Sequence, residues 1–241
     1  MCHADKVLVS QTTRTGGTTQ DIVDQCVEFH LSYLPQETSN IVSYIPAASE
    51  HNPSYLFDIE FTTEQFNQKN HDFRKNHEAF FDCVRAKTWT ILPLGVNGHF
   101  TVVIMHAIRV PMPGTRLGFR MHIQNVVVAD PQRNAQLEQY IYQRLEYVFT
   151  NKRGFRFDKK TPVKLWFPKQ DDRLTCGLRV YEIIRVMLMR ISQSAAEVGL
   201  KDGCDPDTIW QDLSGMSLQI HTSSSSFDLS KSHRPRCKMI L

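Results

Sequence analysis

Apolar side chains recur every three or four residues in several stretches of the chain, which is the spacing of an amphipathic helix. This pattern predicts helices over residues 19–34, 62–84, 134–151 and 176–192. Thr63 is the expected cap of the second helix, and Pro35 closes the first. The helix over 176–192 is apolar on most of its sides, and we therefore expect it to be buried.

Short runs rich in β-branched and aromatic residues lie between these helices. They predict strands over residues 40–45, 55–61, 88–94, 99–110, 122–129 and 163–167. Two Pro and two Gly make 111–118 a turn, and the basic stretch 152–160 is expected to be a loop. Residues 126–129 are all apolar, which predicts a strand covered on both faces. Together these patterns indicate a mixture of helix and strand.

Composition narrows the class of protein. Of 241 residues, 41% are hydrophobic and 22% charged, which is typical of a globular chain and argues against disorder. A formal charge of +3 is too balanced for a nucleic-acid binder, and no apolar run approaches the length of a membrane span. The N-terminus lacks the apolar stretch of a secretory signal. We therefore expect an intracellular monomer, in the nucleus or cytoplasm, that binds neither nucleic acid nor membrane.

The same patterns predict the domain organisation. Residues 1–18 are polar and are expected to form a flexible lead, and residues 19–220 a single domain. Residues 221–241 are rich in Ser and basic residues, which predicts a disordered tail.

Six cysteines are scattered along the chain with no C-x-x-C pair: Cys2, Cys26, Cys83, Cys176, Cys204 and Cys237. Zinc sites use paired spacings, so we expect no bound metal. Without a secretory signal, the cysteines are expected to be reduced thiols.

Cys176 differs from the others in its position, because it follows a polar loop and opens the most apolar helix. The positive end of a helix dipole lowers the pKa of a thiol, and Gly177 leaves room beside the sulfur. Considered alone, a buried structural cysteine is the commoner case. A cysteine nucleophile also needs a base, an orienting acid and an oxyanion donor. His99 begins a predicted strand, Asp130 ends another, and Gln170 lies six residues before Cys176.

The order of these residues resembles one family. The matching segments are Trp89, Gly98-His99-Phe100, Val128-Ala129-Asp130, Gln170 and Thr175-Cys176-Gly177. In this order the chain resembles the ubiquitin-like-protein-specific cysteine proteases, that is, the SUMO proteases with their deneddylase and adenovirus-protease relatives. The resemblance covers about residues 20–192. Phe100 stands where the family usually has Trp, and residues 18–21 lack the Trp that usually opens an early helix.

The resemblance implies an α+β fold of papain-like architecture, in which a mixed central sheet packs against a buried helix that carries the nucleophile. It implies that 19–220 is a catalytic domain with His99, Asp130 and Cys176 as catalytic residues and Gln170 as oxyanion donor. Trp89, Phe100 and Gly177 would contact the substrate, and no cofactor would be needed. The implied activity is a thiol protease or isopeptidase that processes a ubiquitin-like modifier or removes it from protein conjugates.

Two other functions use the same residues. Related effector acyltransferases employ a Cys, a His and an acid, but that acid is usually Glu and an accompanying pocket is densely basic. A non-catalytic protein that binds a ubiquitin-like modifier is the other alternative, although all four chemical positions are intact here.

Overall fold

The computed structural model describes residues 20–58, 62–96, 98–114, 117–158, 165, 169 and 175–198. The predicted lead 1–18, the tail 221–241, the domain boundary at 220 and Gln170 all lie outside these residues. Of the strand predicted over 163–167, the structure describes Leu165 alone, and Leu165 is not in a strand.

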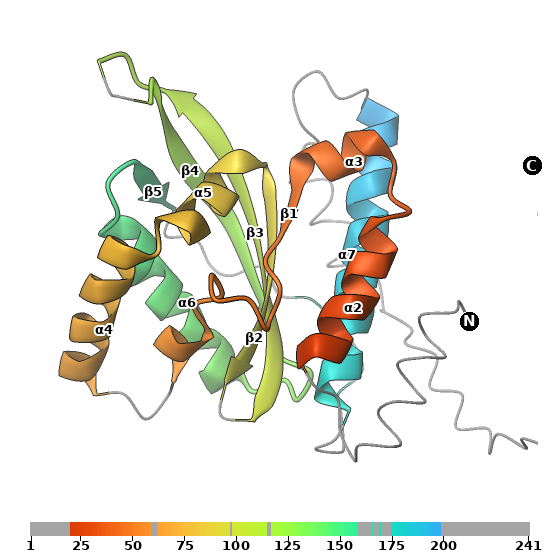
Figure 1. The fold of residues 1–241 in the computed structure, drawn as a ribbon, viewed down its shortest axis with the longest axis horizontal. Coiled ribbons are helices and arrows are strands. Elements are labelled where there is room, and N and C mark those ends of the chain that lie inside the picture. Colours follow the sequence, from red (N-terminus) through yellow and green to blue (C-terminus); the bar gives the residue numbers. More distant parts are fainter. Residues whose placement is uncertain are drawn as a thin grey trace, which may run out of the picture.

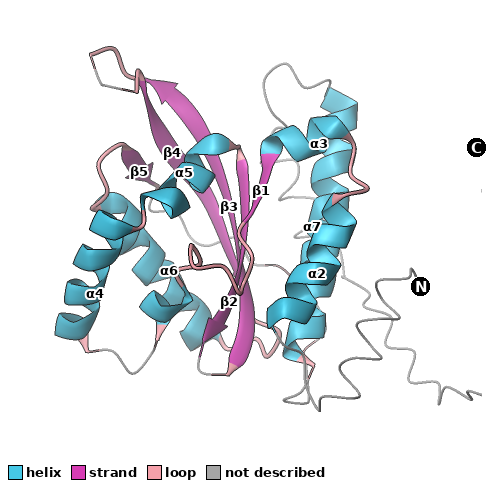
Figure 2. Ribbon diagram, in the orientation of Figure 1, coloured by secondary structure: helices cyan, strands magenta, loops and turns pink. Residues whose placement is uncertain are grey.

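A five-stranded sheet forms the centre of the molecule (Figures 1 and 2). Its strands are β1 (Val42–Tyr44), β2 (Trp89–Val96), β3 (His99–Pro111), β4 (Phe119–Ala129) and β5 (Phe155–Phe157), and they lie in that order. The two edge strands, β1 and β5, run parallel to their neighbours, whereas β2, β3 and β4 pair antiparallel. The sheet is therefore mixed, and the α+β class that the resemblance implies is confirmed.

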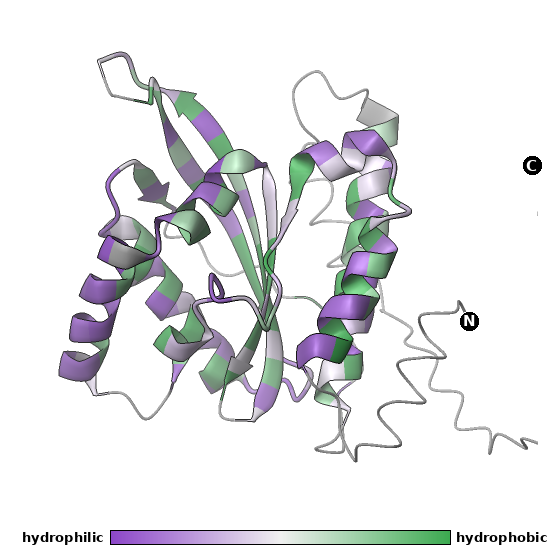
Figure 3. Cartoon of the chain, in the orientation of Figure 1, coloured by the Kyte–Doolittle hydropathy of each residue, from purple (hydrophilic) through white to green (hydrophobic). Residues whose placement is uncertain are grey.

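One face of the sheet is covered by α4 (Thr63–Asn76), α5 (Glu78–Ala86), α6 (Ala135–Thr150) and a short 3-10 helix, η1 (Ser54–Phe57). Aromatic side chains fill this layer: the Phe80 and Phe81 rings contact each other, and each also contacts the rings of Phe73 and Phe149. The outer turns of α4 are mainly hydrophilic (Figure 3), as expected for a helix that lies at the surface.

The opposite face is covered by α2 (Gln20–Leu31), α3 (Gln36–Ile41) and α7 (Cys176–Val198). A second core joins α2 and α7 to residues 100, 102 and 104 of β3 and residues 127 and 129 of β4. Residues 126 and 128 of β4 belong to the aromatic core on the other face of the sheet. This strand is therefore buried on both faces, as its sequence predicts. Among the described residues, no helix has the length and apolar character needed to cross a membrane.

The structure corrects several of the predicted elements. The helix predicted over 62–84 is interrupted at His77, whose backbone is not helical, and Thr62 rather than Thr63 caps its first part. Phe73 and Phe80, on either side of this break, lie in one core with their ring centroids 5.3 Å apart. The strand predicted over 55–61 is instead η1 as far as residue 57, where the adjacent Leu56 and Phe57 are both buried. Such consecutive burial does not fit the alternation of a half-buried strand.

The segment 152–160, predicted to be a loop, contains the strand β5. Phe155 and Phe157 are buried while Arg156 between them is exposed, the period-two pattern of a strand. Pairing with residues 121–123 of β4 supplies the hydrogen bonds that three residues could not provide alone.

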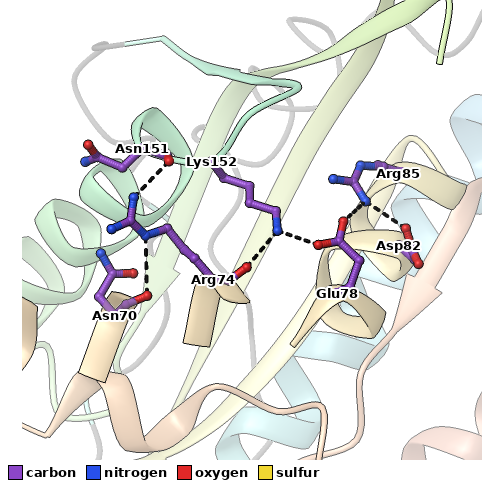
Figure 4. Close-up of polar contacts among 7 residues, drawn as sticks. All are labelled: Asn70, Arg74, Glu78, Asp82, Arg85, Asn151 and Lys152. Atoms are coloured by element: carbon purple, nitrogen blue, oxygen red, sulfur yellow. Dashed lines mark hydrogen bonds and ion pairs between the residues drawn. The ribbon is translucent and has the colours of Figure 1, made fainter. Parts of the chain in front are cut away.

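A polar network ties α4, α5 and the end of α6 together (Figure 4). The Lys152 ammonium contacts Glu78, donates to the Arg74 carbonyl at 2.8 Å and lies 4.3 Å from the centre of the Phe81 ring. Arg74 in turn donates to the Asn151 carbonyl at 2.9 Å. Arg74, at the end of α4, thus binds a carbonyl at the end of α6, and Lys152, just after α6, binds a carbonyl at the end of α4. These two contacts stabilise the packing of α4 against α6.

Candidate active site

The strand register brings His99 and Asp130 to the same end of the sheet. His99 is the first residue of β3 and pairs with Val96, just after the turn from β2. Asp130 directly follows Ala129, which pairs with Val102 three residues along β3 from His99. α7 packs on β3, and the first turns of α2 and α7 lie at this same end (Figure 1). Cys176, the first residue of α7, therefore approaches His99.

His99 contacts Asp130 through its Nε2 atom and the Asp130 Oδ1 atom. Asp130 is completely buried, and its carboxylate also accepts the backbone N–H groups of Gln132 at 3.1 Å and Asn134 at 2.9 Å. These three donors hold the carboxylate in one orientation. The His99 ring is therefore fixed from one side.

The side chain of His99 is hydrogen-bonded to the Cys176 thiol on its other side. Because Nε2 contacts Asp130, we assign the nitrogen that faces the sulfur as Nδ1. Burial lowers the pKa of His99, but the hydrogen bonds and negative charges of Asp130 and Cys176 outweigh burial and raise the pKa to about 9. The imidazolium form is therefore stabilised well above the ordinary value of 6.5.

The Cys176 thiol shows the opposite shift. Burial raises its pKa, but the hydrogen bond from His99, the backbone N–H of Phe100, the His99 charge and the backbone N–H of Gly177 together hold the pKa below its ordinary value. Cys83, by comparison, has a pKa raised by burial and by the neighbouring Asp82. The opposite shifts of the two pKa values favour a thiolate–imidazolium pair of Cys176 and His99, which a solitary buried cysteine cannot form.

Of the three residues predicted to contact the substrate, two lie beside Cys176 and one does not. Phe100 and Gly177 lie beside the Cys176 sulfur through their backbone N–H groups, and the Phe100 side chain packs in the core with Cys176. Trp89 lies elsewhere: it pairs with His106 at the far end of β2, seven residues from Val96. At about 3.3 Å per residue, roughly 23 Å of strand separate it from this site. Trp89 has 0% of its surface exposed, and its role as a substrate contact stays a prediction.

Two features of the site were not predicted. The side chain of Gln20, at the start of α2, lies so close to Gly95 that a Cβ there would be 2.6 Å from its amide nitrogen. Gly95 pairs with Phe100, which follows His99, so Gln20 covers the sheet next to His99 and Cys176. Glu138 accepts a hydrogen bond from the backbone N–H of Asp130 at 3.2 Å. Neither residue carries a recognisable motif, because both roles depend on how distant segments pack.

Known proteins give little further guidance. No protein-family model and no curated protein sequence matches the chain. Among solved structures, a crystal structure of "the de-sumoylating protease" is similar with a TM-score of 0.41 and 11% identity, over 82% of this chain and 72% of that one.

Proposed function

We propose that this chain is a cysteine peptidase that acts on conjugates or precursors of a ubiquitin-like modifier. One observation carries the catalytic part of the proposal. Cys176, His99 and Asp130 form a continuous line of contacts in which the pKa of the thiol is lowered and that of the imidazole is raised to about 9. Opposite shifts in a contacting pair are what an activated nucleophile and its acid partner require.

In the proposed reaction, the Cys176 sulfur attacks the carbonyl carbon that precedes the scissile bond and forms a tetrahedral intermediate. The C–N bond then breaks, and the leaving amine takes the proton from the His99 imidazolium. Water attacks the resulting thioester and gives a proton to His99, and the carboxylate product leaves as the sulfur–carbon bond breaks. Asp130 fixes the ring and stabilises its positive charge throughout.

The negative oxygen of the intermediate needs hydrogen-bond donors. The backbone N–H of Cys176, in the first turn of α7, is one proposed donor, and the side-chain amide of Gln170 is the other. Because Gln170 would act only in the transition state, Gln170→Ala should lower kcat by about 100–1000-fold and leave KM nearly unchanged. A normal kcat in that variant would remove Gln170 from the proposed site.

The substrate class rests on the order of motifs in the sequence. His, Asp, Gln and Cys-Gly occur here in the order found in proteases of ubiquitin-like modifiers, with Gln170 six residues before Cys176. The proposed partners are therefore such a modifier, SUMO-like or Nedd-like, and the proteins conjugated to it. The attacked carbonyl would belong to the last glycine of the modifier.

A panel of modifiers that carry a C-terminal vinyl sulfone tests both parts of the proposal. We expect one modifier to add its mass to the wild-type protein and none to add it to Cys176→Ala. A stable complex without an adduct would instead identify a binding protein. Transfer of an acetyl group from acetyl-CoA, with no modifier adduct, would identify an acyltransferase. Labelling of Cys176→Ala would place the nucleophile elsewhere.

A further inference from the structure

The turn after β4 holds the Asp130 carboxylate by its own backbone. The Arg133 N–H donates to the Asp130 carbonyl at 2.8 Å, and Arg133 has a positive φ of 54°, which closes a tight turn. Asn134 then caps α6 by accepting the N–H groups of Gln136 and Leu137, both at 3.1 Å. The position of Asp130 is therefore coupled to the start of α6.

The backbone N–H of Asp130 lies beyond the hydrogen-bonded ladder of the sheet. The last registered pair of β3 and β4 is Val102 with Ala129, and no backbone carbonyl of the described residues accepts the N–H of Asp130. A buried N–H without an acceptor would be costly. Glu138, in the first turns of α6, supplies that acceptor through its Oε1 atom at 3.2 Å.

We propose that Glu138 is a positioning residue for the reactive pair: by accepting the Asp130 backbone N–H, it holds Asp130 where its carboxylate meets His99. This inference rests on the proposed function. The described charges that raise the pKa of His99 are those of Asp130 and Cys176. Glu138 thus acts through the backbone of Asp130, and the hydrogen-bond acceptor rather than the negative charge is the property that matters.

Three variants separate these properties. Glu138→Gln keeps an acceptor oxygen without the charge, Glu138→Asp keeps the charge but withdraws the acceptor by one methylene, and Glu138→Ala removes both. Gln139→Ala, an exposed neighbour on the same helix, is the matched control. For each variant, three quantities are measured: the pH at which Cys176 alkylation by iodoacetamide is half-maximal, the melting temperature, and kcat/KM on a modifier substrate.

We expect Glu138→Ala and Glu138→Asp to lower kcat/KM by roughly 10-fold, because small misplacements of a catalytic group are costly. Both should also shift the alkylation midpoint of Cys176 to higher pH, since a displaced Asp130 supports the imidazolium less well. Glu138→Gln and Gln139→Ala should match the wild type. A melting temperature lowered without any shift of the midpoint would assign Glu138 to stability alone and overturn the proposal.

The proposal would equally fail if Glu138→Gln were as impaired as Glu138→Ala. Should Glu138→Ala not fold, Glu138→Asp and Glu138→Gln still decide the matter. The alkylation profile needs no substrate. If the wild-type protein cleaved no modifier, the proposed function would fail while the midpoints still tested the role of Glu138.

Discussion

Replacing Asp130 by Asn should reveal how much of the reactivity of Cys176 depends on the ionised His99. Asp130 is the main group that raises the pKa of His99 from 6.5 to about 9, against the opposing effect of burial. A shift of that size corresponds to about 3 kcal/mol in favour of the imidazolium. With Asn in its place, burial is opposed only by Cys176, and the pKa of His99 should fall towards its ordinary value or below.

Two pH profiles report this change. The wild-type kcat/KM on a fluorogenic modifier substrate should rise through the lowered pKa of Cys176 and fall near pH 9, where His99 loses its proton. In Asp130→Asn the alkaline limb should move to lower pH, and the maximum should drop by about 10²–10⁴-fold because the ring is also poorly oriented.

The free energy of unfolding should also depend on pH, because the pKa of His99 is raised in the folded protein. A raised pKa means that the folded protein binds the proton more tightly than the unfolded chain. The free energy of unfolding that Asp130 contributes through His99 is therefore complete below pH 6.5 and is lost as the pH rises through about 9. An alkaline limb that stays near pH 9 in Asp130→Asn would refute the assignment of His99 and Asp130 as an interacting pair.

Three further predictions concern other parts of the structure. At neutral pH, iodoacetamide should alkylate Cys176 much faster than Cys83, because their pKa values are shifted in opposite directions; peptide mass spectrometry measures both. Gly95→Ala should displace the Gln20 side chain and lower kcat/KM with little change in melting temperature, and Gly95→Ala combined with Gln20→Ala should recover part of the loss. Lys152→Met should lower the free energy of unfolding by about 2 kcal/mol, since it removes charge-assisted hydrogen bonds and a ring contact.

Each of these has a result that would contradict it. Equal alkylation of the two cysteines would mean that His99 does not activate Cys176. A double variant no better than Gly95→Ala would show that the contact with Gln20 is not the cause. For Lys152→Met, chemical denaturation is compared with Arg153→Ala, which changes an exposed neighbour. Equal losses in the two variants would mean that the network of Lys152 is not stabilising.

The local pattern of the sequence was enough to predict most helices and strands. Residues 126–129 of β4 are apolar on both faces, and the structure buries them between two helical layers. Asn134 caps α6 where the helical spacing begins. Such features depend on a few neighbouring residues, and local propensity and periodicity describe them well.

The elements predicted wrongly are those in which tertiary contacts outweigh local preference. The three residues of β5 form a strand only because β4 offers them a partner. The helix is interrupted at His77, between Phe73 and Phe80, whose ring centroids are 5.3 Å apart in one core. Trp89 was expected near the substrate because of its place in the sequence order, and strand register puts it at the far end of β2.

For the candidate site, the sequence determined which residues have suitable chemistry, and the tertiary structure decided which of them meet. His99, Asp130 and Cys176 are separated by 31 and 46 residues, and no local signal reports the distance between them. The pairing of β3 with β4 and the packing of α7 on β3 bring them together. The pKa shifts of Cys176 and His99, and the contacts of Gln20 and Glu138, arise only from that packing, because charge and hydrogen-bond effects depend on distance and burial.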